Sequence, residues 1–95
     1  MKAFTLFNLK SNITIEAYRK WSLDQVHPRD FEVVGAMDGK KPPYQLVEEI
    51  VITNPQEFER DNGIGDGAKL AEEWQSRVSD FLVIYCEEIT GDGTG

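Results

Sequence analysis

Apolar residues occupy both alternating sides of the first strand-like segment of the chain. Residues 2–9 read KAFTLFNL, so apolar side chains point to either side of an extended backbone. A strand with this pattern is covered on both faces. The pattern recurs in residues 44–53, YQLVEEIVIT, and in residues 81–89, FLVIYCEEI. We therefore predict three strands that are each apolar on two sides.

A helical pattern follows the first strand. Thr14 is a suitable N-cap residue for a helix over residues 15–23. Tyr18 and Trp21 are three residues apart, which places them on one face of this helix. Pro28 disfavours helical geometry at the residue before it, so the helix ends upstream of that position.

The remaining segments complete the order β-α-β-β-α-β. They are a strand over 31–37, a turn rich in Gly and Pro over 38–43, a short helix from Pro55, a loop over 63–67 and a second main helix over 68–78. This order is the ferredoxin-like pattern. We predict an α+β fold in which a four-stranded antiparallel sheet carries its helices on one face. One domain spans residues 1–90, followed by a Gly-rich tail over 91–95.

Helices on one side cannot cover the other face of such a sheet. An uncovered face would expose a larger apolar patch than monomers normally carry. A second copy of the same sheet is the simplest cover, so we predict a homodimer with twofold symmetry. Alternatively, some of these apolar residues lie at sheet edges and need no partner.

The net charge narrows the range of partners and locations. The chain has a formal charge of -7 and scattered Lys and Arg residues, so we expect neither nucleic acid nor a membrane surface as a partner. No segment approaches the ~20 apolar residues of a membrane span, and no small-residue cleavage site follows the N-terminal apolar run. The single cysteine, Cys86, permits no intrachain disulfide. We therefore expect a cytoplasmic protein.

His27 is the only histidine in the chain and the first candidate for proton transfer. Imidazole exchanges protons near neutral pH, which suits cyclisation, enolisation or dehydration. Asp24 could orient the ring, and Arg29 could bind an acidic group of a substrate. In the alternative, His27 merely ends a helix. Its charged neighbours, Asp30 included, would then form solvated surface.

Two carboxylates interrupt the apolar strand over residues 44–53. Glu48 and Glu49 point to opposite faces, so one faces the helices and the other faces a partner sheet. A buried carboxyl group needs a partner or a raised pKa, which makes one of the two an acid/base candidate. We place Glu48 among the catalytic residues, although the sequence does not settle which of the two faces a pocket. The alternative is a salt bridge to Arg19 or Arg29.

Aromatic residues are candidates for binding a flat ligand. Trp21 and Tyr18 could line a pocket, with the phenol as a hydrogen-bond partner and catalytic assistant. Phe7 and Tyr85 are further candidates for contact with a substrate. In the alternative, these residues are simply core, although a pocket wall can also be core.

No cofactor or metal is expected from the motifs. GIGDG, over residues 63–67, follows a short helix and lacks the Lys-Ser/Thr ending of a phosphate-binding loop. We interpret it as a flexible connection that could act as a lid. One His and one Cys cannot form a zinc site alone.

Two stretches resemble a known family. AFTLFNLKSNITIEAYRKW, over 3–21, and HPRDFEVVGAMDG, over 27–39, resemble the REDY-like group of the dimeric α/β-barrel superfamily, and the likeness covers nearly the whole chain. Several barrel relatives carry an aromatic helix followed by a His near the second strand, here Tyr18, Trp21 and His27. The resemblance implies a dimeric barrel, a pocket between sheet and helices in each subunit, and a role in prodiginine pigment biosynthesis.

Three functions fit these features. The first is a cofactor-free enzyme that binds an aromatic or pyrrolic intermediate and catalyses cyclisation with loss of water, with His27 moving a proton and Tyr18 or Glu48 assisting. Oxygenation without a cofactor is a rival reaction. The second function is a carrier that binds the intermediate without catalysis. The third is a structural partner of a larger enzyme.

Overall fold

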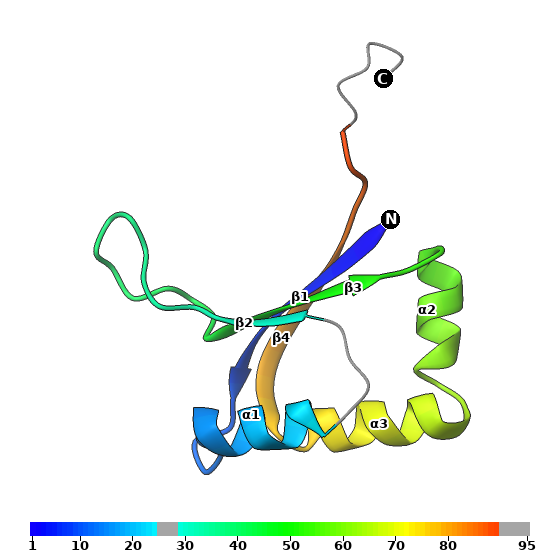
Figure 1. Ribbon diagram of the computed structural model, residues 1–95, viewed down its shortest axis with the longest axis horizontal. Helices are drawn as coiled ribbons and strands as arrows, with labels where there is room; N and C mark the ends of the chain where they lie inside the picture. The colour runs from blue at the N-terminus through cyan, green and yellow to red at the C-terminus, as the bar shows by residue number, and fades with distance from the viewer. Residues whose placement is uncertain (25–28, 90–95) are drawn as a thin grey trace.

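The computed structural model describes residues 1–24 and 29–89. Its elements in chain order are β1 (Lys2–Leu9), α1 (Ile15–Leu23), β2 (Arg29–Glu32), β3 (Leu46–Val51), α2 (Pro55–Asp61), α3 (Gly65–Gln75) and β4 (Val78–Cys86). The strands form one sheet in the order β2-β3-β1-β4, and every neighbouring pair is antiparallel. This arrangement confirms the predicted α+β, ferredoxin-like fold (Figure 1).

Side-chain caps fix where the first two helices begin. The Thr14 hydroxyl accepts a hydrogen bond from the backbone N–H of Ala17 at 3.0 Å, as expected for the cap of α1. The Asn54 side-chain oxygen accepts one from the N–H of Glu57 at 2.8 Å. Pro55 then occupies the first turn of α2, where its missing N–H leaves no hydrogen bond unmade. Each cap satisfies an amide that has no acceptor within its helix.

The core lies between the sheet and the helices. Every second residue of β1 is buried, namely Ala3, Thr5, Phe7 and Leu9. Phe7 is fully buried, and its ring centroid lies 5.4 Å from that of Tyr18 in α1 and 5.2 Å from that of Trp74 in α3. Burial of these large rings supplies much of the hydrophobic stabilisation that holds both helices on the sheet.

The opposite face of the sheet is apolar and exposed. Leu6 pairs with Leu82, and Phe4 pairs with Ile84, so these four side chains share a face. Leu82 and Ile84 keep 47% and 41% of their surface exposed. Phe31 of β2 also belongs to this face and is exposed. We call this surface the open face.

The second strand differs from the prediction. The sequence predicts a strand over 31–37, whereas β2 spans Arg29–Glu32. Val34 and Met37 are almost fully exposed and lie in the segment that leads to β3. This segment extends away from the rest of the chain, so no strand pairs with it and its strand propensity is overridden (Figure 1).

The boundaries of the later elements also differ from the prediction. β3 is shorter at both ends than residues 44–53, and β4 begins three residues before Phe81. Val78, expected on the second main helix, is instead the buried first residue of β4. The helix ends at Gln75, and the chain turns at once into the sheet.

The GIGDG segment is structured by its contact with α2. Gly65 is the first residue of α3 and has a φ of +55°. A Cβ atom at Gly67 would collide with the carbonyl oxygen of Asp61, the last residue of α2. Glycine therefore allows α3 to begin directly against the end of α2. The first turn of α3 thus includes three of the five residues that were predicted to form a loop, and their role as a lid stays a prediction.

The predicted tail over residues 91–95 lies outside the described residues. None of the helices in the described ranges is long and apolar enough to cross a membrane.

Candidate functional site

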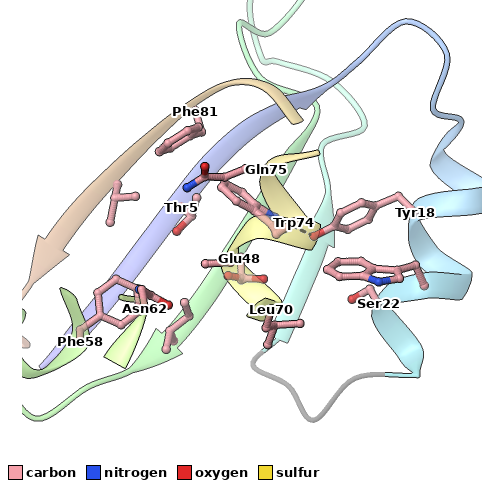
Figure 2. Close-up of a pocket in the computed structure, with 14 residues that line it drawn as sticks. Thr5, Tyr18, Ser22, Glu48, Phe58, Asn62, Leu70, Trp74, Gln75 and Phe81 are labelled. Carbon is pink, nitrogen blue, oxygen red and sulfur yellow. Dashed lines mark hydrogen bonds between the residues drawn. The ribbon is translucent and has the colours of Figure 1, made fainter. Parts of the chain in front are cut away.

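A cavity of about 330 Å³ lies between the helices and the sheet. Aromatic side chains from four elements form much of its wall, namely Tyr18, Trp21, Phe58, Trp74 and Phe81. In the view of Figure 2, Glu48 lies near the centre of the lining side chains, with Tyr18 and Ser22 on one side and Phe58 and Asn62 on the other. The volume and the largely apolar wall are typical of a site for a small molecule.

Three polar residues form a row across the sheet at the floor of this cavity. Thr5 of β1 stands opposite Glu48 of β3, which in turn stands opposite Asp30 of β2. Residues that are directly opposite in antiparallel strands share a face, with Cβ atoms about 5 Å apart. Glu48 is therefore flanked by a hydroxyl group and a second carboxyl group. We call these three residues the polar row.

Asp30 is held in place by α1. The Ser22 hydroxyl donates a hydrogen bond to Asp30 Oδ2 at 2.5 Å. Asp30 Oδ1 is buried and receives no hydrogen bond from a donor in the described residues. Two ionised carboxylates cannot donate to one another, so Asp30 and Glu48 can form a hydrogen bond only when one of them carries a proton.

Glu48 carries that proton. Burial, the charge of Asp30 and the hydrogen bond between the two carboxyl groups raise the pKa of Glu48 from 4.5 to about 8. Burial is the largest cause, because the mainly apolar cavity disfavours the charged form. Glu48 is therefore mostly neutral at pH 7 and can donate a proton inside the cavity.

Tyr18 links the cavity to the core. Its hydroxyl oxygen accepts a hydrogen bond from Trp74 Nε1 at 3.1 Å. Burial raises the pKa of Tyr18, and the charges of Asp30 and Glu48 raise it further. The phenol therefore stays protonated at neutral pH. It can donate a hydrogen bond to a ligand, but it cannot serve as a base.

Ring contacts hold the aromatic wall in place. The centroids of Tyr18 and Trp21 are 5.6 Å apart, and those of Trp74 and Phe81 are 5.1 Å apart. The Arg77 guanidinium lies 4.4 Å from the ring centroid of Trp21. Packed rings change rotamer less readily than isolated ones, so the shape of the wall is largely formed before a ligand enters.

The chain matches a known protein family over almost its whole length. The family model, described as REDY-like protein HapK, covers residues 1–89. The chain belongs to the REDY-like family. This result confirms the resemblance carried by residues 3–21 and 27–39. No match was found among curated proteins.

The fold of this REDY-like protein brings three of the predicted site residues together. Tyr18, Trp21 and Glu48 all line the cavity. Glu49 lies on the open face, where it forms ion pairs with Lys2 at 3.2 Å and Arg29 at 3.8 Å. Glu48 is therefore the member of the acidic pair that faces the helices, and the proposed salt bridge to Arg29 belongs to Glu49.

Three other predicted site residues are described by the structure and do not line the cavity. Phe7 lies in the core and is not a lining residue. Arg29 pairs with a carboxylate on the open face. The Tyr85 hydroxyl donates a hydrogen bond to Glu59 Oε2 at 2.6 Å at the surface. His27 lies outside the described residues.

The cavity also involves residues that the sequence pattern does not reveal. Asp30 is expected on solvated surface, yet it stands beside Glu48 and binds Ser22. The register between β2 and β3 creates this pair. That register depends on the long connection over residues 33–45, which no local pattern fixes. Trp74 both packs against the core and lines the cavity.

Proposed function

We propose that this chain is a cytoplasmic, cofactor-free protein of prodiginine-type pigment biosynthesis. In this proposal it binds an aromatic or pyrrolic intermediate in the cavity and catalyses an acid/base cyclisation or dehydration. The observation that carries the proposal is Glu48, a carboxyl group kept neutral at pH 7 among aromatic side chains. Membership of the REDY-like family supports the biosynthetic setting.

The cavity residues suggest a division of roles. The aromatic wall holds a flat ligand by ring contacts. Glu48 gives its proton to a hydroxyl group of the intermediate, and the C–O bond breaks as water leaves. The resulting carboxylate then takes a proton from the adjacent C–H or N–H of the intermediate, so a double bond forms and Glu48 is neutral again. Tyr18 donates a hydrogen bond to an oxygen of the ligand, and His27 stays a predicted second group for proton transfer.

Glu48→Gln tests the catalytic role. Glutamine keeps the size and the hydrogen-bonding capacity of the side chain but cannot exchange a proton. We expect turnover of the pathway intermediate to fall by at least about 100-fold, which is the usual range for loss of a general acid or base. Affinity for the intermediate, measured by tryptophan fluorescence, should change much less.

Glu49→Gln is the matched control, because Glu49 is the next residue of the same strand and faces away from the cavity. We expect it to keep wild-type turnover when both variants have the wild-type oligomeric state. Wild-type turnover in Glu48→Gln would contradict the mechanism. A wild-type protein that binds the intermediate tightly and never consumes it would instead support the carrier function.

We also propose that the open face binds a second copy of the chain to form a homodimer. Its apolar side chains come from β1, β2 and β4, and Leu82, Ile84 and Phe31 are each more than two-fifths exposed. Its charges balance, because Glu49 pairs with Lys2 and Arg29 and a second carboxylate, Asp80, lies on the same face opposite Asn8. An apolar face with balanced charges is complementary to itself, as a twofold interface requires.

The double variant Leu82→Lys/Ile84→Lys is expected to be monomeric. Two ammonium groups cannot be desolvated on an apolar interface without partners. Light scattering coupled to gel filtration should give twice the chain mass for the wild type and the chain mass for the variant. Ile64→Lys, which places an ammonium group at the exposed N-cap residue of α3, should remain dimeric. A monomeric wild type at micromolar concentration would refute the proposed dimer.

A further inference from the structure

Among the described residues, the cavity has carboxyl groups but no cationic side chain in its wall. Glu48 lines it, and Asp30 stands beside Glu48 on the next strand. Among the described residues that line the cavity, none is Lys or Arg. A ligand carboxylate or phosphate would therefore approach carboxyl groups without meeting a positive side chain. The lining disfavours anionic ligands.

The polar row has an acceptor that the described residues leave unpaired once Glu48 is ionised. Asp30 Oδ1 is buried and has no hydrogen-bond donor in the described part of the chain, apart from the proton that Glu48 shares with Asp30. Buried polar groups are normally paired. Asp30 therefore indicates a ligand that brings a hydrogen-bond donor to the cavity floor.

The wall above the floor also suits a positive charge. The faces of Trp and Tyr rings attract cations, and Tyr18, Trp21 and Trp74 contribute such rings to the wall. A planar cation with N–H groups can stack on these rings and direct its donors at a carboxylate. Such charge-assisted pairs are stronger than neutral hydrogen bonds.

We propose that the cavity binds a planar, nitrogen-containing ligand in its cationic form, with an N–H group directed at Asp30 and Glu48. The inference rests on the proposed function, because it specifies the ligand of the same cavity. When the cation binds, the proton of Glu48 leaves to solvent and the carboxylate pairs with the ligand. One positive charge enters as another leaves, so the charge of the cavity is conserved. For turnover, the bound cation returns an N–H proton to the carboxylate, so that Glu48 is again the neutral acid that the proposed reaction needs.

Among the described residues, few charged groups compete with Glu48 in this exchange. Asp30 faces it from β2, and Tyr18 faces it from α1. The lining residues from α2 and α3 are uncharged, as is Thr5 on β1. Arg77 lies over Trp21 and acts on Tyr18. A proton released on cation binding near pH 7 is therefore assigned to Glu48.

Three probes with the same ring and different charges test this inference. Benzamidine is a cation at pH 7, benzamide is neutral and benzoate is an anion. We expect tryptophan fluorescence to give benzamidine at least about tenfold tighter binding than benzamide, with benzoate weakest. Calorimetry in two buffers with different ionisation enthalpies should show release of close to one proton with benzamidine and none with benzamide.

Variants assign the effect to the carboxyl pair. Glu48→Gln should abolish proton release and reduce the preference for benzamidine at least fivefold, and Asp30→Asn should also reduce this preference. Glu49→Gln should retain both properties. The inference is wrong if benzoate binds as tightly as benzamidine, if no probe binds the wild type, or if proton release survives in Glu48→Gln. If Glu48→Gln loses turnover but the wild type shows no preference for cations, only this inference is wrong. If the wild type prefers cations but has no turnover, only the catalytic proposal is wrong.

Discussion

Replacement of Glu48 by Gln is expected to stabilise the protein above pH 8 and to change its stability little near pH 4. The pKa of Glu48 is about 8 in the folded state and 4.5 for an ordinary Glu. Between these values, the folded state binds more protons than the unfolded state, so the free energy of unfolding falls as the pH rises. The stabilisation from the bound proton is complete below pH 4.5 and lost as the pH passes 8.

The size of this change in stability follows from the pKa shift of Glu48. One pKa unit corresponds to about 1.4 kcal/mol, so the wild type loses up to roughly 5 kcal/mol across this range through Glu48. Glutamine is neutral at every pH and suffers no such loss. Urea denaturation at pH 5, 7 and 9, at one protein concentration, measures the difference between the two proteins.

Glu49→Gln again provides the comparison. The Glu49 carboxylate is paired with Lys2 and Arg29 on the open face. Glu49→Gln therefore leaves Glu48 unchanged, and the protein still loses stability at high pH. We expect Glu49→Gln to follow the wild-type pH dependence and Glu48→Gln to flatten it. Equal slopes for the wild type and Glu48→Gln between pH 5 and 9 would show that Glu48 is already ionised at pH 5.

Phe7→Ala is expected to lower the free energy of unfolding by about 3–5 kcal/mol. The Phe7 side chain is fully buried and contacts the rings of Tyr18 and Trp74. Its removal leaves a cavity beneath both main helices and withdraws a contact from two residues of the aromatic wall. Chemical denaturation measures the loss directly.

Phe7→Leu separates packing from ligand contact. Leucine fills most of the same volume, so we expect a loss of less than about 1.5 kcal/mol. Because Phe7 is not a lining residue, this variant should bind benzamidine as tightly as the wild type. A small loss of stability in Phe7→Ala, or a large loss of ligand affinity in Phe7→Leu, would place this residue in the site instead of the core.

Local signals predict the first half of the fold well. The alternation over residues 2–9 and the Thr14 cap lie within single segments, and both elements begin and end where predicted. Elements that depend on distant partners are harder to predict from the sequence. The strand over 31–37 is cut short because no strand pairs with its second half, and α3 starts early because Gly67 packs against α2.

The candidate site is likewise predictable only where a local pattern fixes its residues. Helical spacing predicts that Tyr18 and Trp21 share a face, and strand parity predicts that Glu48 and Glu49 point apart. The choice between these two carboxyl groups requires knowledge of which face the helices cover. The pairing of Asp30 with Glu48 requires the register across β2 and β3, which a one-residue slip would reverse.

The central claim is that Glu48 carries a proton in the cavity at neutral pH. A titration of the side-chain carboxyl carbon by NMR, with ¹³C-labelled Glu and with Glu48→Gln to assign the signal, tests it most directly. We predict a signal that titrates near pH 8, far above those of exposed Glu residues. A Glu48 signal that titrates near pH 4.5 would show an ionised carboxylate at pH 7, and the cavity would then lack the acid that the proposed reaction needs.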